Sequence, residues 1–201
     1  MIKKRSKLVY GVGVNDADYN VYETENVDGK RKNIWMCPFY VTWTSMLVRC
    51  YSEKLHARLP TYKDCTVCDE WLIFSNFKTW MEKQNWEGKA LDKDLLVPNN
   101  KIYSPEYCVF IDSKINNFIL DTKASRGLYL LGVTWEKSRN KFKAQCSNPF
   151  TGKSENLGRF ENEYQAHLAW KARKHELACQ LADSEYCNDP RLAEALHTRY
   201  L

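Results

Sequence analysis

The residues that could carry chemistry are concentrated in residues 91–117, LDKDLLVPNNKIYSPEYCVFIDSKINN. The segment starts with two carboxylates, Asp92 and Asp94, on either side of Lys93, and it ends with two asparagines. Carboxylate and amide oxygens are ligands for Mg²⁺ and similar cations, and a cation held by few protein ligands keeps positions open for water and a phosphate. By spacing alone, the segment is more typical of a hairpin whose Asp and Asn side chains make local turn contacts.

The elements within this segment must bring its two ends together if they are to share a cation. Two short strands around the turn at 98–100, followed by a brief helix that ends near Asn117, are predicted from the turn residues. A hairpin folded against a helix would place its outer strand, with Asp92, beside Asn116 and Asn117. We therefore expect the ligands to converge from different elements.

The flanking sequence predicts helices before the segment and a sheet after it. Residues 1–33 have little periodicity and are expected to form an arm with a short strand at 8–14. Apolar residues three and four apart predict helices over 35–50, with Pro38 in the first turn, and over 71–84. Beyond a basic connector at 121–127, the pattern predicts strands over 131–137, 140–149 and 155–160, a helix over 163–182 capped by Asn162, and a last helix over 190–200.

The charge of the 201-residue chain is modest overall but unevenly distributed. The formal net charge is +5, with 44% hydrophobic and 27% charged residues, which is typical of a globular protein. Residues 123–175 hold eleven Lys or Arg against four Glu. Such clustering is expected of a phosphate-binding surface, where released counterions supply much of the affinity.

The sequence has no apolar run of the roughly 20 residues needed to span a bilayer and no signal-peptide pattern. We therefore expect a cytoplasmic protein with no membrane partner. Eight cysteines are then expected to be reduced. Cys65 and Cys68 have zinc-knuckle spacing, but no second Cys-x-x-Cys exists, so buried free thiols are favoured over a zinc site.

Several motifs in order over residues 35–118 resemble bacteriophage nucleases of the HNH (ββα-metal) class, which are homing-endonuclease-like proteins. The resemblance rests on Trp43-x-x-Met46-x-x-Arg49-Cys50-Tyr51, Tyr62, Cys68-Asp69-Glu70-Trp71-x-x-Phe74-x-x-Phe77, Leu91-Asp92-Lys93-Asp94 and Tyr103-Ser104-Pro105-Glu106-x-Cys108. It implies a Mg²⁺ (or Mn²⁺) site with Asp92 as the first ligand. The second implied ligand is Asn117, with Asn116 as the near alternative.

The chain departs from this family at two catalytic positions. Lys93 stands where the family has a histidine that acts as general base. Because two flanking carboxylates disfavour a neutral lysine, we expect Lys93 to bind phosphate instead. The base would then be metal-bound hydroxide, Asp94 or Glu106. The family's central asparagine falls near Tyr107, and Asn100 is a substitute for it.

Residues 131–175 resemble the plant ethylene-response-factor type of DNA-binding domain, three antiparallel strands packed on a helix, which also occurs fused to phage HNH nucleases. The resemblance rests on Gly132-Val133-x-Trp135, Lys141-Phe142-Lys143-Ala144, Leu157-Gly158-x-Phe160 and Ala166-x-x-Ala169-Trp170. Side chains alternate along a strand, so Lys141, Lys143 and Gln145 should share one face while Phe142 and Ala144 pack on the helix. The DNA-reading face is expected to display Trp135, Lys137, Arg139, Lys141, Lys143, Gln145 and Arg159.

The sequence thus predicts an α+β protein with a ββα-metal nuclease-like domain and a three-stranded antiparallel sheet packed on a helix. The expected divisions are an arm (1–34), the nuclease domain (35–120), the DNA-binding domain (128–182) and a helical tail (183–201). The expected function is a phage-encoded endonuclease that acts on double-stranded DNA, as a monomer that nicks one strand. The alternatives are an inactive descendant that only binds DNA, and a protein-binding module.

Overall fold

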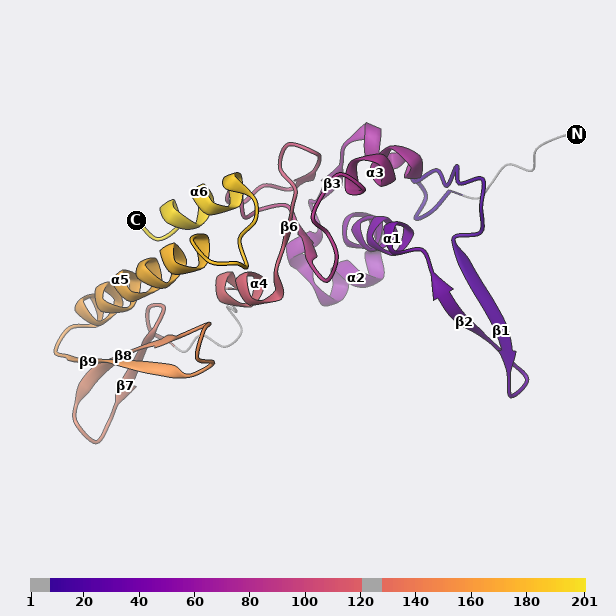
Figure 1. Cartoon of the computed structure of the whole chain (residues 1–201). Helices are drawn as coiled ribbons and strands as arrows, with labels where there is room; N and C mark the ends of the chain where they lie inside the picture. Colours follow the sequence, from indigo (N-terminus) through magenta and orange to yellow (C-terminus); the bar gives the residue numbers. More distant parts are fainter. Residues whose placement is uncertain (1–7, 121–127) are drawn as a thin grey trace, which may run out of the picture. The chain divides into compact units, whose positions relative to one another are not determined.

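The computed structural model describes residues 8–120 and 128–201 as a mixed α+β protein with several small sheets (Figure 1). The chain forms two compact units. The first comprises residues 1–87 and 91–110, and the second comprises residues 88–90 and 111–201, so α4 belongs to the second unit. The expected connector at 121–127 lies outside the described residues. No helix in the described part of the chain is long and apolar enough to cross a membrane.

The first unit combines short helices with three two-stranded sheets. The sheets pair β1 with β2, β3 with β5, and β4 with β6, and the last pair lies at the edge of the unit. In chain order the elements are β1 (Tyr22–Val27), β2 (Lys30–Met36), α1 (Pro38–Tyr51), α2 (Glu53–Arg58), η1 (Pro60–Tyr62), β3 (Thr66–Val67), η2 (Asp69–Leu72), α3 (Phe74–Met81), β4 (Ala90–Asp92), β5 (Ile102–Tyr103) and β6 (Val109–Ile111).

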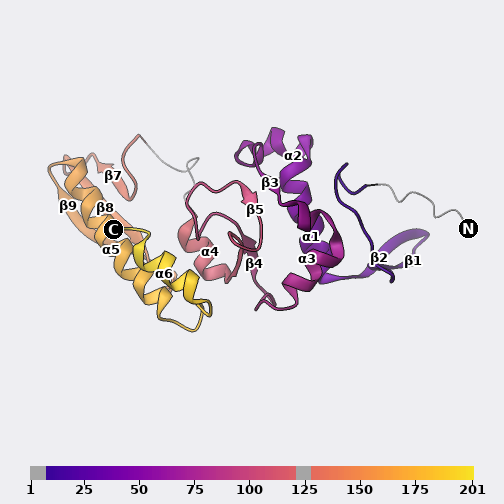
Figure 2. The same ribbon diagram turned by 90° about the horizontal axis from the view of Figure 1, so that it is seen from above.

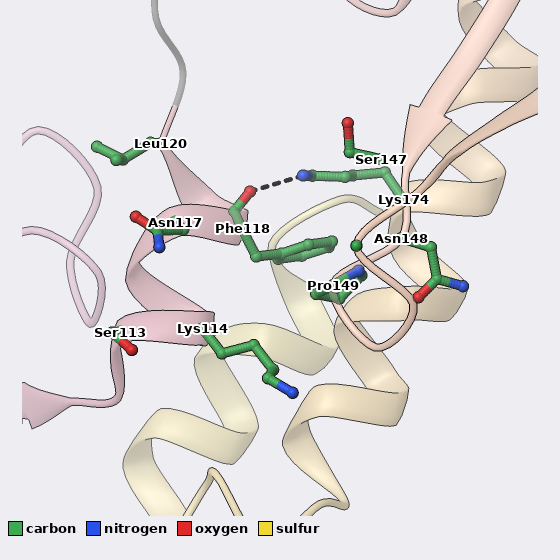
Figure 3. Close-up of a pocket in the computed structure, with 10 residues that line it drawn as sticks. Ser113, Lys114, Asn117, Phe118, Leu120, Ser147, Asn148, Pro149 and Lys174 are labelled. Carbon is green, nitrogen blue, oxygen red and sulfur yellow. Dashed lines mark hydrogen bonds between the residues drawn. The ribbon is translucent and has the colours of Figure 1, made fainter.

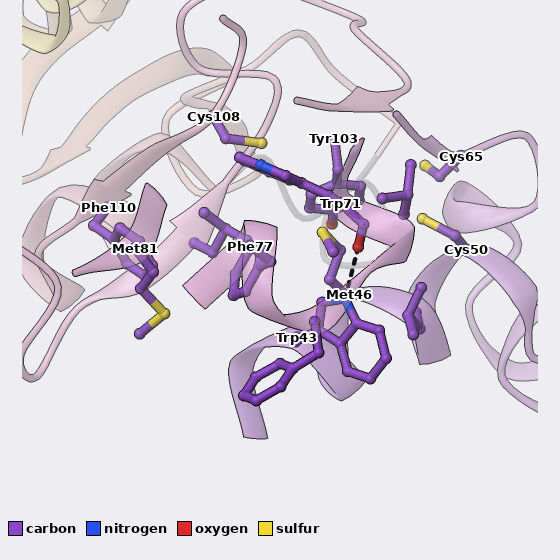
Figure 4. Close-up of a cluster of buried hydrophobic side chains, with 14 of the residues drawn as sticks. Trp43, Met46, Cys50, Cys65, Trp71, Phe77, Met81, Tyr103, Cys108 and Phe110 are labelled. Carbon is purple, nitrogen blue, oxygen red and sulfur yellow. Dashed lines mark hydrogen bonds between the residues drawn. The ribbon is translucent and has the colours of Figure 1, made fainter. Parts of the chain in front are cut away.

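The core of the first unit lies between α1 and α3, which confirms the helix expected over 35–50. Pro38 occupies the first turn of α1, where its missing N–H costs no hydrogen bond. The apolar positions of α1 and α3 are buried together (Figure 4). The buried indole of Trp43 donates a 2.7 Å hydrogen bond to the backbone oxygen of Trp71, so its polar atom is satisfied within the core.

The helix expected over 71–84 is interrupted. Residues Asp69–Leu72 form the short helix η2, Ile73 is extended, and α3 begins only at Phe74. The cause is a long-range contact, because the N–H of Val14 donates to Leu72 and the carbonyl of Val14 accepts from Phe74. The N-terminal segment therefore replaces one turn of helix with strand-like pairing.

The prediction of a hairpin around residues 98–100 is wrong. The strand before this turn, β4, pairs with β6, whereas the strand after it, β5, pairs in parallel with β3. Backbone bonds from Thr66 to Lys101 (2.9 Å) and from Cys68 to Tyr103 (2.9 Å) hold β5 against β3. Because both expected strands have partners elsewhere, residues 93–101 form a loop.

The arm expected over the first 33 residues contains a hairpin that the sequence analysis missed. Strands β1 and β2 pair antiparallel around Asp28 and Gly29, which both have positive φ angles (53° and 72°). That combination is typical of a type I′ turn. Every residue of β2 is exposed, so its apolar side chains do not contribute to the core, and the strand lacks the buried face by which alternation is recognised.

The second unit has the predicted order of strands and helices. Figures 1 and 2 show α5 beside α6, and Figure 1 shows the sheet on the other side of α5. The sheet is antiparallel in the order β7-β8-β9, and Asn162 caps α5 by accepting from the N–H groups of Tyr164 and Gln165. The elements are α4 (Ser113–Ile119), β7 (Val133–Glu136), β8 (Lys141–Ser147), β9 (Ser154–Phe160), α5 (Glu163–Ala182) and α6 (Pro190–Thr198).

The backbone immediately before β7 approaches α5 closely at Gly132. Its φ is +75°, and an added Cβ would lie 2.0 Å from Cγ of Trp170. Gly152 has a similar φ of +68° but nothing within 4 Å of an added Cβ. Comparing an alanine substitution at each of the two glycines therefore separates the effect of backbone strain from the effect of a steric clash with Trp170.

We predict that Gly132→Ala lowers the free energy of unfolding by about 2–4 kcal/mol, since it adds a steric clash to the cost of a left-handed residue. The matched variant Gly152→Ala should cost only about 1–2 kcal/mol, because it adds the backbone strain alone. Urea denaturation followed by circular dichroism and tryptophan fluorescence measures both values. Equal losses would contradict the role of the Gly132–Trp170 contact.

Candidate functional site

Asp92 closes β4 and organises the loop that follows. Its Oδ1 accepts hydrogen bonds from the N–H groups of Asp94 (3.0 Å) and Leu95 (2.7 Å), so one carboxylate oxygen fixes the turn. Its Oδ2 forms no hydrogen bond with any described residue. Burial, and secondarily the charge of Asp94, raises the pKa of Asp92, while the two backbone donors lower it. The residue therefore offers one oxygen to a ligand.

Lys93 does not extend into solvent. The residue is only 6% exposed, and its ammonium donates to Asp94 Oδ2 at 3.0 Å and to the backbone oxygen of Asn100 at 3.1 Å. The nitrogen also lies 5.9 Å from the centroid of the Tyr103 ring. The ammonium thus ties the two ends of the loop together, a role that the sequence analysis did not predict. A phosphate would reach it only if this loop opened.

Asn100 is fully occupied by the same loop. Its amide nitrogen donates to the backbone oxygens of Lys93 and Ile102, both at 2.7 Å, and its Oδ1 accepts from the N–H of Ile102 at 3.2 Å. Since no hydrogen-bonding group of the amide is left over for another side chain, Asn100 fixes the loop in this structure. Its side chain forms no hydrogen bond with a described group that could act as a general base, so the structure gives no support to the expected base-orienting role of Asn100.

The two expected asparagine ligands belong to the second unit. Asn116 and Asn117 lie on α4, whose N-terminal turn is capped by Asp112 through a 2.7 Å bond from the N–H of Lys114. Asn117 is exposed, and its amide forms no hydrogen bond with a described residue. It lines a cavity that also contains the side chains of Lys114 and Lys174. Asp92 and Asn117 therefore come from different compact units.

The sheet of the second unit has one face on α5 and one open face. Val133, Ala144 and Ala166 form the buried contact between sheet and helix. In the observed register, Lys143 pairs with Thr134 on one side and with Arg159 on the other, and directly opposite residues share a face. The alternation predicted for β8 is confirmed in that Ala144 is buried against α5.

Trp135 is a correction to the expected DNA-reading face. It lies opposite Phe142, with ring centroids 4.7 Å apart, and Phe142 in turn lies opposite Phe160. These rings belong to the helix side of the sheet, because Phe142 and Phe160 pack against its core. The alternation of residues along β8 does not show which residues of β7 lie on the same face of the sheet. The sequence analysis therefore assigned Trp135 to the wrong face. Lys137 and Arg139 lie in the exposed turn between β7 and β8.

Carboxylates balance much of the positive charge on the open face. Glu136 pairs with Arg159 through two hydrogen bonds and also lies 3.5 Å from Nε of Arg139, and Lys141 pairs with Glu161. Hydrogen bonding from Arg159 lowers the pKa of Glu136. Among the described residues, Lys143 has no ion-pair partner. Its ammonium is therefore the most available cation in the centre of this face.

The sequence analysis missed the side chains of Lys114 and Lys174. A signal for Lys174 was present, because it lies four residues after Trp170 and three before Leu177, on the apolar side of α5. Burial lowers the pKa of Lys174 to about 8, the nearby Cys146 raises it, and Arg199 lowers it further. A lysine within an apolar stripe is therefore a marker of a constrained ammonium.

The structure and the comparisons assign no metal or family. All eight cysteines are free thiols, and burial raises the pKa of Cys50 and of Cys108 to about 12. Within residues 8–120 and 128–201, no group of three or more His, Cys, Asp or Glu side chains is arranged to hold a metal ion. Comparisons with protein-family models, with curated proteins and with solved structures find no match to this chain.

We predict that Lys174 titrates near pH 8 in the folded protein and near 10.4 when unfolded. Between these values the unfolded chain binds more protons, so the stability of the wild type relative to Lys174→Met should rise with pH, by up to about 3 kcal/mol. Urea denaturation at pH 7 to 10.5 measures the difference, and an NMR titration of the Lys174 Cε signal gives the midpoint. A difference that is flat or falls with pH would contradict the assignment.

Proposed function

We propose that the protein is a phage-encoded DNA endonuclease that hydrolyses one phosphodiester of double-stranded DNA with Mg²⁺ or Mn²⁺. The observation that carries the proposal is the carboxylate of Asp92, which is fixed by two backbone donors through one oxygen, while its other oxygen has no hydrogen bond to a described residue. The strand pair β4–β6, followed directly by α4, is the part of the chain that we propose to be a ββα-metal unit. A single such site addresses one phosphate, so nicking is the proposed outcome.

The oxygen donors of this region fit a hard cation better than a soft one. Asp92 would hold the cation with its second oxygen, and Asp94 has an exposed carboxylate beside it. Asn116 and Asn117, the amide ligands expected from the sequence, belong to the second unit. Mg²⁺ is commonly held by one or two carboxylates together with water and substrate phosphate. When bound, the cation would polarise the phosphate and lower the pKa of a bound water.

The open face of the β7–β8–β9 sheet is the proposed DNA contact. A small sheet or ribbon can enter the major groove, where Arg and Gln contact base edges and Lys contacts phosphates. Lys143 and Gln145 alternate with buried residues on β8, and Arg159 lies directly across from Lys143. The Glu136–Arg159 pair would have to open for Arg159 to read a base, and an exposed pair of this kind is weak.

The second candidate is a DNA-binding protein without nuclease activity. It is favoured by the position of Lys93, which stands where the family has its general base but is buried and bonded to Asp94. Asn100, the substitute for the base-orienting asparagine, is also occupied within the loop. Binding of DNA through the second unit would be unaffected by these features.

We predict that Asp92→Asn reduces Mg²⁺-dependent nicking of supercoiled plasmid by at least about 100-fold while duplex affinity changes less than twofold. The amide oxygen preserves the acceptor that caps the turn and removes only the charge, so the loop is expected to remain folded. Conversion of supercoiled to open-circular DNA measures nicking, and fluorescence anisotropy measures affinity.

Asp64→Asn is the matched control, because Asp64 is an exposed carboxylate elsewhere in the first unit. It should nick as well as the wild type. Equal nicking by Asp92→Asn would rule out Asp92 as the ligand. Duplex binding by the wild type without strand breaks in Mg²⁺ or Mn²⁺ would select the second candidate.

We predict that Lys143→Gln weakens duplex binding and reduces the slope of log K against log salt by about 1, since one phosphate contact is lost. Glu136→Gln should act in the opposite direction, because it releases Arg159 and Arg139 from their carboxylate partner. Anisotropy titrations of one duplex at several salt concentrations measure both effects.

The control for this pair is Lys171→Gln, which removes the same charge from α5, the helix that covers the other face of the sheet. Its ammonium donates to the backbone oxygen of Leu201. If Lys171→Gln and Lys143→Gln changed the salt slope equally, the open face would not be the DNA contact.

A further inference from the structure

The second unit contains a cavity that no part of the nuclease proposal requires. It has a volume of about 470 Å³ and lies between α4 and the loop from β8 to β9 (Figure 3). Ligand pockets commonly have volumes of about 300–1,000 Å³, so this cavity is large enough for a small organic molecule. Its lining comes from segments far apart in the sequence, which include Lys114 and Phe118 on α4, Ser147 at the end of β8, Pro149 in the loop, and Lys174 on α5.

The charge of the lining is positive. Two lysines contribute to it, and no Asp or Glu in the described part of the chain does. Lys174 Nζ donates to the backbone oxygen of Phe118 at 2.6 Å and lies 3.5 Å from the centroid of that residue's ring. An ammonium has three donors, so two remain after this bond. The contacts of Lys174 thus position the charge without neutralising it.

Lys114 is held in a similar way. Its Nζ lies 4.0 Å from the ring centroid of Tyr186 and 5.9 Å from that of Phe150, and it forms no ion pair with a described residue. Aromatic faces attract a cation but leave its charge uncompensated. Since the partners of both lysines among residues 8–120 and 128–201 are neutral, an anion in the cavity would be the first countercharge that these residues leave room for.

The remaining lining supplies neutral donors and apolar surface. The exposed amide of Asn117 and the hydroxyl of Ser147 can donate to an oxyanion, and neither group is occupied by a described partner. Phe118 and Pro149 add apolar surface to the same cavity. This combination suits a ligand with a phosphate at one end and a flat, largely apolar group at the other.

We propose that this cavity binds the phosphate of a nucleotide between Lys114 and Lys174, with the base and sugar against Phe118 and Pro149. The nucleotide is either a free mononucleotide or the phosphorylated end of a DNA strand, which present the same chemistry. The inference does not depend on hydrolysis by the first unit.

The test is an NMR titration of the full chain with thymidine 5′-monophosphate and, separately, with thymidine. The monophosphate is expected to shift the Asn117 side-chain amide and the backbone signals of residues 147–152, and thymidine is not. Lys114→Met and Lys174→Met should each weaken monophosphate binding at least about tenfold, since each removes a charged hydrogen bond. Lys171→Met is the matched control, because Lys171 lies on the same helix as Lys174 but its ammonium donates to the backbone oxygen of Leu201 and is not part of the cavity lining, and it should leave this binding unchanged.

A single-stranded oligonucleotide with and without a 5′-phosphate identifies the source of the ligand. Binding of the monophosphate at these signals supports a free nucleotide, and binding only of the phosphorylated oligonucleotide supports a strand end. Equal shifts with thymidine, shifts confined to other residues, or full binding by the Lys114→Met/Lys174→Met double variant would overturn the proposal. Asp92→Asn should bind the monophosphate normally, so loss of nicking and loss of this site are distinguishable.

Discussion

The packing of α5 against one face of the β7–β8–β9 sheet determines both surfaces of the second unit. A three-stranded sheet cannot bury its own apolar face, so Val133 and Ala144 must be covered by a helix, and Ala166 covers them. The alternation of β8 then forces Lys143 onto the open face. Along α5 the same apolar side continues one turn beyond Trp170 to Lys174, which carries a positive charge into the cavity. One helix–sheet contact thus organises two separate cationic sites.

The loop that follows β4 is organised around a buried ammonium. Lys93 would be costly to bury alone, but its charge is bonded to Asp94 and to the carbonyl of Asn100. Asn100 returns two hydrogen bonds to the backbone of the same loop, and Asp92 caps its start. These groups satisfy one another locally, so a loop without regular structure can hold a carboxylate in a defined position. As a consequence, most of the polar atoms of this loop are already hydrogen-bonded and cannot bind a substrate or a cation.

Local patterns in the sequence predicted those elements whose stability is local. The helices α1 and α5 follow apolar spacing and their first-turn residues, and the three strands after residue 130 follow alternation. The β1–β2 hairpin, which pairs locally around Asp28 and Gly29, was missed, but the other failures involve partners on other strands or segments. Hydrogen bonds to Val14 interrupt the helix expected over 71–84, and β5 and β4, which were expected to form a hairpin, pair with β3 and β6 instead. The pairing of β7 with β8 places Trp135 on the face that packs against α5. For the same reason, the residue types of the candidate site could be named in advance, but the burial of Lys93 and the surroundings of Asn117 could not.

In the proposed nuclease, Lys93 stands where the family that the sequence resembles has a histidine, which changes where a proton could go during hydrolysis. A general base must present a neutral nitrogen or a free carboxylate oxygen to water. The nitrogen of Lys93 donates to a carboxylate and a carbonyl, and is directed into the loop. The acceptors that this chain itself offers are the exposed carboxylate of Asp94, whose other oxygen forms no bond with a described residue, and the exposed carboxylate of Glu106. A nuclease built on this loop would therefore use Lys93 to position Asp94 and would draw its basicity from an oxygen.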